Sequence, residues 1–422
     1  MRINGLSSTI SILLSFNVRA VHGFALKSPN FVSARSRACS LSMALENRCF
    51  EVFNAEEAKQ KSTTPPEGVM SLASPLAGHT FSGLVEEALK FRFEACKITR
   101  VIQSLHLLES DYEHIEWIQS STKPNIYFKQ HAPSYVPGLT VRPFWRTIKG
   151  TTLSIEQQSS QPNFQVLEDW CSLLEKNYEL IRDDFAKSMS NPTRLVQEGN
   201  NVWAGALTED ASSYGQGWKT LVLFDRGTWD ASNVSLFPQT SRFLHENLPP
   251  DFAVEIFFAQ MDPSSTIQPH SDFTNFVVTS HLAIDIPYSG TNLCRLSVGD
   301  VTQEWINGKV TVFDTSLMHD AVNESDKTRY ILMFRLWHPD LSLEERRALQ
   351  FIYDCLVVPE LASAKTDSER FMAEQRLQVL RSFPSQTLIK NKTSSLSTGF
   401  GGGGGKKKSK AKSKSRSKGF GS

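Results

Sequence analysis

The chain has 422 residues, of which 40% are hydrophobic and 10% aromatic, so it can bury a sizeable core in one large domain with appendages. The net charge of +1 hides an uneven distribution, because residues 406–418 carry eight Lys or Arg and no acid, and the rest has 37 basic against 44 acidic residues, a net of −7. A mildly acidic body excludes a general attraction for nucleic acid, so we expect no specific nucleic-acid partner and only weak electrostatic contacts from the basic tail.

The first 45 residues read as a targeting leader. Arg2 precedes a short apolar patch, "ISILLSF", no Asp or Glu occurs before Glu46, and a Ser/Arg-rich stretch follows Phe24. This two-part design resembles the bipartite leaders that direct proteins to complex plastids, which predicts a plastid location. A leader for the secretory pathway and endoplasmic reticulum, or for the mitochondrion, is the alternative. No apolar run reaches about 18 residues, so we expect no transmembrane segment.

Composition then divides the chain. "KSTTPPEG" and "SPLAG" indicate a linker over 46–80, and apolar residues at helical spacing predict a helical region over 81–130. Residues 131–349 form the expected main domain. Helices are expected over 350–390, and 391–422 is a Gly-rich and basic tail that cannot pack a core.

The main domain begins with helical and loop patterns. "YVPGLTVRPFW" is a Pro/Gly-punctuated aromatic segment typical of a lid or entry loop, and "FQVLEDWCSLLEKNYELIRDDFAKSM" predicts an amphipathic helix. After Trp203 short β-branched and aromatic runs alternate with turn residues, which indicates a β-sandwich or barrel. Helix returns in "SLEERRALQFIYDCL", where Ser342 is the expected N-cap and Glu345 follows three residues later.

Polar residues that can support chemistry lie on or beside these strands. His270 and Asp272 lie in "IQPHSDFTNF", His281 within "NFVVTSHLAI", His319 after "KVTVFD", and Arg329 at the start of "RYILMFRLW". A buried imidazole or guanidinium without a partner costs roughly 1–3 kcal/mol or more, so each of them needs a partner. A 2-His-1-carboxylate site for Fe(II) accounts for His270, Asp272 and His319. An Fe(II) oxygenase that uses 2-oxoglutarate also needs a cation for the far carboxylate of this cosubstrate. The planar guanidinium of Arg329 could supply it.

Each residue also has an ordinary explanation when it is taken alone. A His-x-Asp pair occurs often by chance, and His319 fits a solvated loop histidine. Arg329 fits a surface ion pair, and His281 fits a hydrogen-bonded core histidine. Only the ordered combination on a β-rich scaffold favours a metal site.

From about Tyr135 to Leu349 the sequence resembles the aspartyl/asparaginyl β-hydroxylase family. The segments that carry the resemblance include "IQPHSDFTNF", "HLAIDIP", "VGDVTQEWINGKVTVFDTSLMHDAVN" and "TRYILMFRLWHPDLSLEERRAL". The resemblance implies a mainly β catalytic core, a double-stranded β-helix of the jelly-roll or cupin type, flanked by N- and C-terminal α-helices. It implies a dioxygenase that uses Fe(II), 2-oxoglutarate and O2.

Matching positions imply particular roles. His270 and His319 fall on the family's two iron-binding histidines, His281 and Arg329 fall on residues that contact 2-oxoglutarate, and His338 is structural by default. Asp272 departs from the best-known animal members, which have Gly there, so this chain can offer a full facial triad.

The chain also has Thr279 and Ala259 where those members have Arg and Ser. Cosubstrate binding is therefore expected to depend on Arg329 and His281, with Asn275 as a further candidate.

The expected reaction is hydroxylation of an unactivated C–H bond, with 2-oxoglutarate converted to succinate. Asp or Asn side chains of a peptide or protein are the first expected substrates. A lipid acyl chain or a free amino acid is the alternative substrate. A non-catalytic β-helix domain that serves as a binding module is the alternative from another class, motivated by the missing polar residues at Thr279 and Ala259.

Overall fold

The structure of the chain is a computed structural model, and it describes residues 51–52, 81–109, 114–120, 126–132, 134–152, 163–205, 213–272 and 274–381. The expected leader and tail, and nearly all of the expected linker, lie outside the described residues. The plastid location and the role of the basic tail therefore stay predictions.

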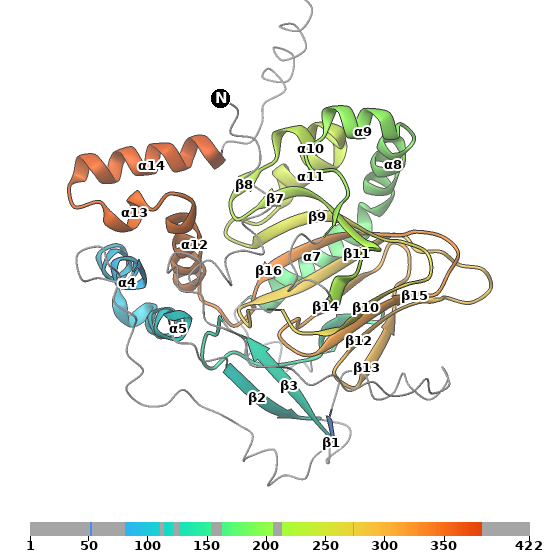
Figure 1. The fold of residues 1–422 in the computed structure, drawn as a ribbon, viewed down its shortest axis with the longest axis horizontal. Coiled ribbons are helices and arrows are strands. Elements are labelled where there is room, and N and C mark those ends of the chain that lie inside the picture. The colour runs from blue at the N-terminus through green and yellow to red at the C-terminus, as the bar shows by residue number, and fades with distance from the viewer. Residues whose placement is uncertain are drawn as a thin grey trace, which may run out of the picture. The chain divides into compact units, whose positions relative to one another are not determined.

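Eight consecutive strands form the centre of the fold (Figure 1). They are β9 (Ala253–Met261), β10 (Ser265–His270), β11 (Val277–Asp285), β12 (Cys294–Val298), β13 (Val301–Glu304), β14 (Val310–Phe313), β15 (His319–Asn323) and β16 (Arg329–Trp337). One sheet contains them in the order β14-β11-β16-β9 and the other in the order β10-β15-β12-β13, with every pairing antiparallel. Successive strands thus cross between the two sheets, except that β12 and β13 are neighbours in the smaller one, which is the topology of a jelly roll or double-stranded β-helix. The expected fold class is confirmed.

Five further strands give the first sheet nine strands in all. On one side β4 (Phe144–Thr147) pairs with β14 and β5 (Gly150–Thr151) pairs with β4, while on the other side β7 (Trp218–Asp225) pairs with β9. Two-residue strands β6 (Ala204–Gly205) and β8 (Thr228–Trp229) pair with β7. The "YVPGLTVRPFW" segment therefore runs into β4, the strand next to the edge of the main sheet.

The two faces of the nine-stranded sheet are both apolar. Alternate residues such as Phe257 and Met333 join one buried cluster with residues of the smaller sheet, whereas Phe258 and Phe334 join another with the helices. Side chains alternate between the faces of a strand, so a sheet covered on both sides reads as a nearly continuous apolar run. This explains why "AVEIFFAQM" and "RYILMFRLW" are hydrophobic along almost their whole length.

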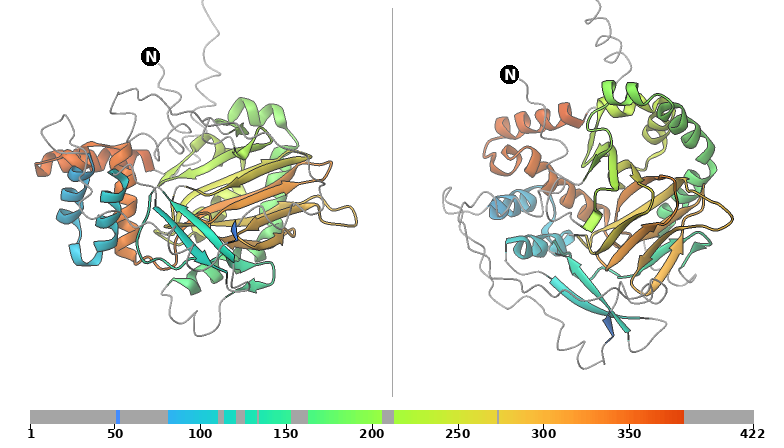
Figure 2. Two further views of the ribbon diagram at one scale, coloured as in Figure 1. Left: turned by 60° about the horizontal axis from the view of Figure 1, so that its bottom comes forward. Right: turned by 45° about the vertical axis from the view of Figure 1, so that its right-hand side comes forward.

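Helices cover the outer face of this sheet (Figure 2). They are α7 (Phe164–Lys176), α8 (Tyr178–Met189), α9 (Pro192–Glu198), α10 (Ala231–Leu236) and α11 (Pro238–Asn247). The single helix expected from "FQVLEDWCSLLEKNYELIRDDFAKSM" is divided at Asn177, whose Nδ2 donates to the carbonyl oxygen of Leu173 at 2.8 Å. Trp170, Leu174 and Ile181 are buried against the sheet, as an amphipathic helix requires.

Replacing Phe258 with alanine should destabilise the protein by about 3–5 kcal/mol, because a large buried side chain would leave a cavity. Phe258 is 0% exposed, and its ring centroid lies 4.7 Å from that of Phe185 and 4.6 Å from that of Phe237. Urea unfolding measures the loss. The matched control is Phe371→Ala, at a side chain that is 58% exposed. Equal losses in the two variants would contradict the assignment of this core.

The region 81–130, expected to be helical, is only partly so. Helices α4 (Phe81–Arg92) and α5 (Thr99–Glu109), with the 3₁₀ turn η1 (Ala95–Lys97) between them, are followed by strands β2 (His114–Gln119) and β3 (Ile126–Ala132). β3 lies between β2 and the two-residue strand β1 (Glu51–Val52) in a small antiparallel sheet. The helical expectation is wrong for "HIEWIQ" and "IYFKQHA", whose β-branched and aromatic residues favour strands.

This small sheet is attached beside the smaller sheet of the jelly roll. Phe128 is buried against Gly299, where a Cβ atom would lie 3.0 Å from the phenyl ring and the φ angle is +57°. Gln130 donates from Nε2 to Oγ of Ser316 at 2.9 Å. The hairpin therefore supports the turn that leads into His319.

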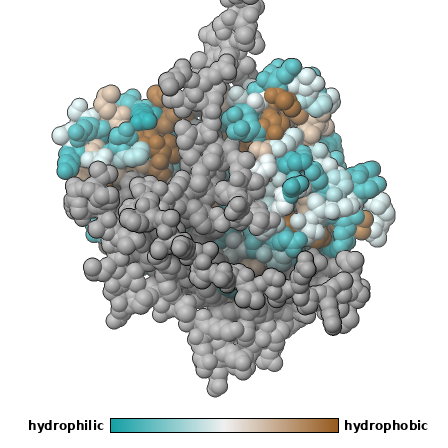
Figure 3. Space-filling view, in the orientation of Figure 1, coloured by the Kyte–Doolittle hydropathy of each residue, from teal (hydrophilic) through white to brown (hydrophobic). Residues whose placement is uncertain are grey.

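C-terminal helices α12 (Leu343–Val357), α13 (Glu360–Ser363) and α14 (Asp367–Arg381) pack with α4 and α5 around a separate apolar cluster. Ser342 caps α12 and forms the expected capping box with Glu345. On the face in Figure 3, hydrophobic side chains gather along the inner edge of this helical group and hydrophilic ones along its outer edge. Within the described part of the chain, no helix combines the length and apolar character needed to span a membrane.

Candidate metal and cosubstrate site

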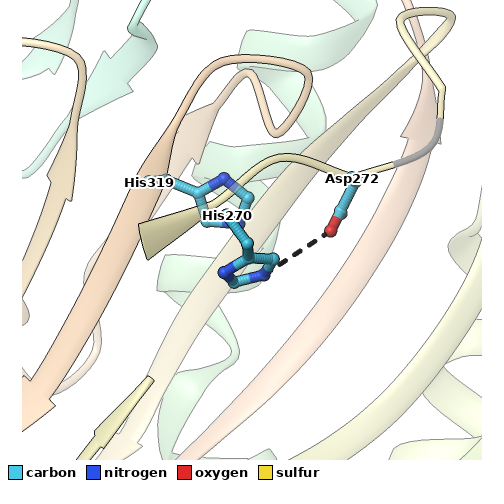
Figure 4. Close-up of side chains that lie close together, drawn as sticks. All are labelled: His270, Asp272 and His319. Atoms are coloured by element: carbon cyan, nitrogen blue, oxygen red, sulfur yellow. Dashed lines mark ion pairs between the residues drawn. The ribbon is translucent and has the colours of Figure 1, made fainter. Parts of the chain in front are cut away.

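Two paired strands place the candidate metal ligands together. His270 ends β10 and His319 begins β15, and the two residues are register partners in the antiparallel pair. Asp272 follows two residues after His270, and the nitrogen and oxygen atoms that these three side chains can offer all lie within 4.8 Å of one another (Figure 4). The structure thus brings together the three residues that the sequence predicted as iron ligands, and their role as ligands is developed below as a proposal.

Hydrogen bonds fix which imidazole nitrogen faces the centre of the group. Nδ1 of His270 lies 2.8 Å from the carbonyl oxygen of Gln268, and Nδ1 of His319 lies 2.9 Å from that of Leu317. A carbonyl only accepts, so each Nδ1 carries the proton and each Nε2 presents a lone pair. Burial, and secondly the neighbouring His270, lowers the pKa of His319 to about 4. The neutral form needed for metal binding is therefore the ordinary state near pH 7.

Asp272 is held by two partners. Its Oδ2 accepts from Nη1 of Arg335 at 2.5 Å, and its Oδ1 accepts from the hydroxyl of Tyr214 at 3.0 Å. Burial alone would raise the pKa of Asp272, but the charge and hydrogen bond of Arg335, together with the neighbouring His319 and His270, outweigh burial and hold the pKa below its usual range. Two imidazoles and one carboxylate form a donor set that fits Fe(II) in non-haem oxygenases.

These three residues line a small cavity of about 40 Å³ inside the jelly roll. Aromatic and apolar side chains supply most of the remaining wall, namely Tyr214, Trp218, Ile267, Leu296, Trp305, Phe313, Ala321 and Met333. His281, Thr315 and Arg329 complete the lining. The lining, mostly apolar with a few convergent polar groups, is that of a small-molecule site, although the volume is below the roughly 300–1,000 Å³ usual for such sites.

Arg329 is the most unusual of the lining residues. Its side chain is fully buried, and none of its three guanidinium nitrogens has a hydrogen-bond partner among the described residues. Its Cζ lies 4.2 Å from the ring centroid of Trp305 and 5.6 Å from that of Trp218. Cation–π contacts contribute about 0.5–2 kcal/mol each, whereas burying an ion costs several kcal/mol. Burial accordingly lowers the pKa of Arg329 to about 10.

His281 presents a second unused donor. Its Nδ1 accepts from the indole Nε1 of Trp305 at 3.2 Å, so the proton of the neutral ring is on Nε2. That Nε2 is buried and has no partner among the described residues. Burial, followed by the charge of Arg329, holds the pKa of His281 well below its usual value. The cavity thus combines a buried guanidinium with a neutral N–H donor, which suits a carboxylate.

Asn275 is not part of this cavity, so the structure corrects its proposed role in cosubstrate binding. Its Oδ1 accepts from the backbone N–H of Val136 at 2.8 Å, and its Nδ2 donates to the carbonyl oxygen of Val136 at 2.9 Å. Both polar atoms are therefore used to attach the "YVPGL" segment to the jelly roll. The sequence suggested Asn275 because it lies in the loop near the histidines. It could not reveal the structural role, because the backbone partner lies 139 residues away.

The two positions that differ from the family pattern lie on the inner face of the sheet. Ala259 is fully buried in the inner apolar cluster. Thr279 is fully buried, has an Oγ1 without a partner among the described residues, and is the register partner of Arg335. A guanidinium therefore does project beside this position, but from the neighbouring strand.

Among the side chains that contact the predicted ligand and cosubstrate residues, sequence reasoning missed Tyr214, Trp218, Trp305 and Arg335. Arg335 has a signal in the sequence, since it occurs at even spacing from Arg329 on one strand and so projects to the same face. Trp305 lies within one of the segments that carry the family resemblance but was given no role, and the proximity of Tyr214 and Trp218 to the site depends on the tertiary fold.

His338 has the structural role expected of it. It is fully buried, with Nε2 at 2.9 Å from the carbonyl oxygen of Thr140 and Nδ1 accepting from the N–H of Asp340 at 3.1 Å. Its ring centroid also lies 5.0 Å from that of Trp145.

The stability supplied by His338 should fall as the pH decreases from about 6.5 toward about 4. Burial lowers the pKa of His338 from 6.5 to about 4, so in this window the unfolded chain takes up a proton that the native protein does not. Urea unfolding at pH 7 and pH 5 should show a larger loss for wild type than for His338→Gln. A loss of the same size in both would show that His338 does not cause it.

Together, the strand order and the buried two-histidine, one-carboxylate cluster define a jelly-roll protein with a candidate metal centre of the non-haem iron type. Residues 175–339 match the family described as aspartyl/asparaginyl beta-hydroxylase. This part of the chain is thus similar to that family, in agreement with the resemblance inferred from the sequence.

Curated proteins are similar to about the same part of the chain. The chain is 29% identical over 183 residues to aspartyl/asparaginyl beta-hydroxylase of Homo sapiens, covering 42% of this chain and 22% of the relative. It is 32% identical over 191 residues to aspartate beta-hydroxylase domain-containing protein 2 of Homo sapiens, covering 43% and 48%. It is 25% identical over 164 residues to ornithine lipid ester-linked acyl 2-hydroxylase of Rhizobium tropici, covering 39% and 55%.

The matches span less than half of the length of the two human relatives. Among solved structures, an oxidoreductase of the 2OG-Fe(II) oxygenase family from Burkholderia pseudomallei is similar with a TM-score of 0.24 and 14% identity, over 31% of this chain and 72% of that chain. The fold assignment rests on the strand pairing described above.

Proposed function

We propose that this chain is an Fe(II)- and 2-oxoglutarate-dependent dioxygenase that hydroxylates an unactivated C–H bond, with Asp or Asn side chains of a peptide or protein as the first candidate substrates. The supporting observation is Arg329, a fully buried guanidinium without a hydrogen-bond partner among the described residues, in the same cavity as His270, Asp272 and His319. A carboxylate is the partner that such a guanidinium favours.

Each cavity residue has a part in this activity. His270, Asp272 and His319 would hold Fe(II) through the two Nε2 atoms and a carboxylate oxygen. Arg329 would bind the far carboxylate of 2-oxoglutarate, and the Nε2–H of His281 would donate to the same cosubstrate. Fe(II) with 2-oxoglutarate and O2 supplies the oxidation that converts C–H to C–OH and releases succinate and CO2.

The surrounding residues position these groups and exclude water. Trp305 stacks on Arg329 and donates to His281, so one side chain fixes both cosubstrate contacts. Trp218 and Phe313 add apolar wall to the cavity. Excluding water strengthens the electrostatic contacts inside the site.

Succinate formation tests this proposal. The full-length chain would be incubated with Fe(II), 2-oxoglutarate and O2 and with peptides that contain Asp or Asn, free amino acids or acyl lipids. Succinate and the mass of each candidate would then be measured. The expected result is substrate-dependent succinate and a gain of one oxygen atom in one class of candidate. A gain only in amino acids or lipids would overturn the peptide assignment but keep the oxygenase.

A second substrate class has its own support. The acyl 2-hydroxylase of Rhizobium tropici matches 39% of this chain, and most of the cavity wall is apolar or aromatic. Hydroxylation of an acyl chain is therefore the alternative, and the lipid arm of the same experiment distinguishes it from peptide hydroxylation.

A non-catalytic binding module requires a separate test. Anaerobic addition of Fe(II) and 2-oxoglutarate should give a visible charge-transfer band if both bind at this centre. Absence of the band at saturating concentrations would favour the module and contradict the proposed enzyme.

A further inference from the structure

Asp272 is fixed by side chains from two separate elements. Arg335 projects from β16, and Tyr214 lies in the segment that precedes β7. The Arg335 Nη1 donates to Oδ2 of Asp272, while the Tyr214 hydroxyl donates to Oδ1 at 3.0 Å. Each carboxylate oxygen therefore has a different donor, and rotation of the carboxylate would break both contacts.

The oxygen that Tyr214 contacts is the one that faces a histidine ligand candidate. Oδ1 of Asp272 lies 3.8 Å from Nε2 of His270. The Tyr214 ring also packs edge-on against the His270 ring, with centroids 4.6 Å apart. Tyr214 thus contacts two of the three candidate ligands at once, one through its hydroxyl and one through its ring.

Arg335 is itself anchored on its far side. Its Nε lies 3.5 Å from Oε2 of Glu255, whose Oε1 lies 3.8 Å from Nε of Arg226. The guanidinium is therefore shared between Asp272 and Glu255, which restricts its position. An anchored cation holds the neighbouring carboxylate in a fixed orientation.

Hydrogen bonds from neighbouring side chains to a metal ligand change the affinity of the site for the metal. Side chains that orient a ligand by hydrogen bonding typically contribute 10–100-fold to metal binding when they are removed one at a time. Tyr214 and Arg335 contact the ligand candidate by which this chain departs from the best-known members of the family that it resembles, because those members have Gly at the position of Asp272.

We propose that Tyr214 and Arg335 are positioning residues that hold Asp272 as the third protein ligand of the metal. This inference rests on the proposed metal site. In this arrangement Tyr214 orients Oδ1 toward the metal position beside His270, and Arg335 retains Oδ2 away from it.

Metal titration tests the inference without requiring a substrate. The full-length chain would be titrated with Co(II) in the absence of O2 and of 2-oxoglutarate, and visible absorption would give both the affinity and the ligand field. Tyr214→Phe removes one hydroxyl and should weaken Co(II) binding about tenfold. Tyr330→Phe is the matched control, because Tyr330 lies on β16 but packs on the helix-covered face of the sheet. This variant should bind Co(II) as wild type does.

Asp272→Ala supplies the reference for a double-mutant cycle. If Tyr214 acts through Asp272, Tyr214→Phe should have no further effect on Co(II) affinity in the Asp272→Ala background. Arg335→Lys keeps the charge and should retain most of the affinity, whereas Arg335→Gln should lose about tenfold or more. Thermal melting of the metal-free variants identifies any that fail to fold, and Tyr214→Phe still decides the case if Arg335→Gln does not fold.

The possible failures are distinguishable. Weaker binding in Asp272→Ala but unchanged binding in both Tyr214→Phe and Arg335→Gln would overturn this inference alone. An equal effect of Tyr214→Phe with and without Asp272 would do the same, since Tyr214 would then act through His270 or the general packing. Wild-type affinity in Asp272→Ala, or no Co(II) binding by wild type, would overturn the proposed three-residue metal site together with the inference.

Discussion

Replacing His319 with alanine should abolish substrate-dependent succinate formation. His319 is 7% exposed, presents its Nε2 toward His270 and Asp272, and has a pKa lowered to about 4 by burial, so it offers a neutral donor near pH 7. A bound metal typically lowers a reaction barrier by several kcal/mol, and each 1.36 kcal/mol is tenfold in rate, so we expect a loss of at least about a hundredfold. Succinate would be measured at saturating 2-oxoglutarate and substrate.

Two controls show that the loss comes from the metal. Chelation of the wild-type protein should give a similar loss that added Fe(II) reverses, whereas Fe(II) should not restore His319→Ala. His245→Ala, at an exposed position on α11, should leave the rate unchanged. Wild-type turnover in His319→Ala would show that His319 is not a ligand and would remove the metal centre from its proposed place.

Much of the jelly roll could be predicted from the sequence because its strands are short, apolar and separated by turn residues. "NFVVTSHLAI" and "RYILMFRLW" contain the two neighbouring central strands β11 and β16. The order of strands in the two sheets could not be read from periodicity, because pairing between residues far apart in the chain depends on the complete fold. The strands β2 and β3 were missed since apolar residues in a short segment can satisfy helical and strand spacing alike.

Some residues of the candidate site could likewise be predicted from the sequence, whereas others could not. His270, Asp272, His319 and Arg329 have local signals in the sequence, because each lies at a strand end or in a turn beside an apolar run. Tyr214 and Trp305 have no such signal, and their contacts with Asp272 and His281 join residues 58 and 24 positions apart. Asn275 shows the opposite error, since a polar residue in the right loop uses both side-chain atoms to hold the backbone of Val136.

Replacing Arg329 with methionine should stabilise the cosubstrate-free protein and weaken 2-oxoglutarate binding at the same time. The buried guanidinium has no hydrogen-bond partner among the described residues, so removing it eliminates a desolvation cost that the cation–π contacts with Trp305 and Trp218 only partly offset. A bidentate charged contact contributes about 3 kcal/mol, which corresponds to roughly a hundredfold in affinity. Functional residues often carry such a cost in stability.

A gain in stability combined with a loss of 2-oxoglutarate affinity distinguishes a binding residue from a structural one. Melting temperature would be measured anaerobically with Fe(II), with and without 2-oxoglutarate, for wild type, Arg329→Met and the exposed-site control Arg347→Met. We expect the cosubstrate to raise the melting temperature of wild type and of the control, because it binds only the folded state, and to have little effect on Arg329→Met. If Arg329 served only to pack against Trp305, its replacement would lower the melting temperature without 2-oxoglutarate and leave the cosubstrate-induced rise intact. That outcome would remove the main support for a dicarboxylate cosubstrate in this cavity.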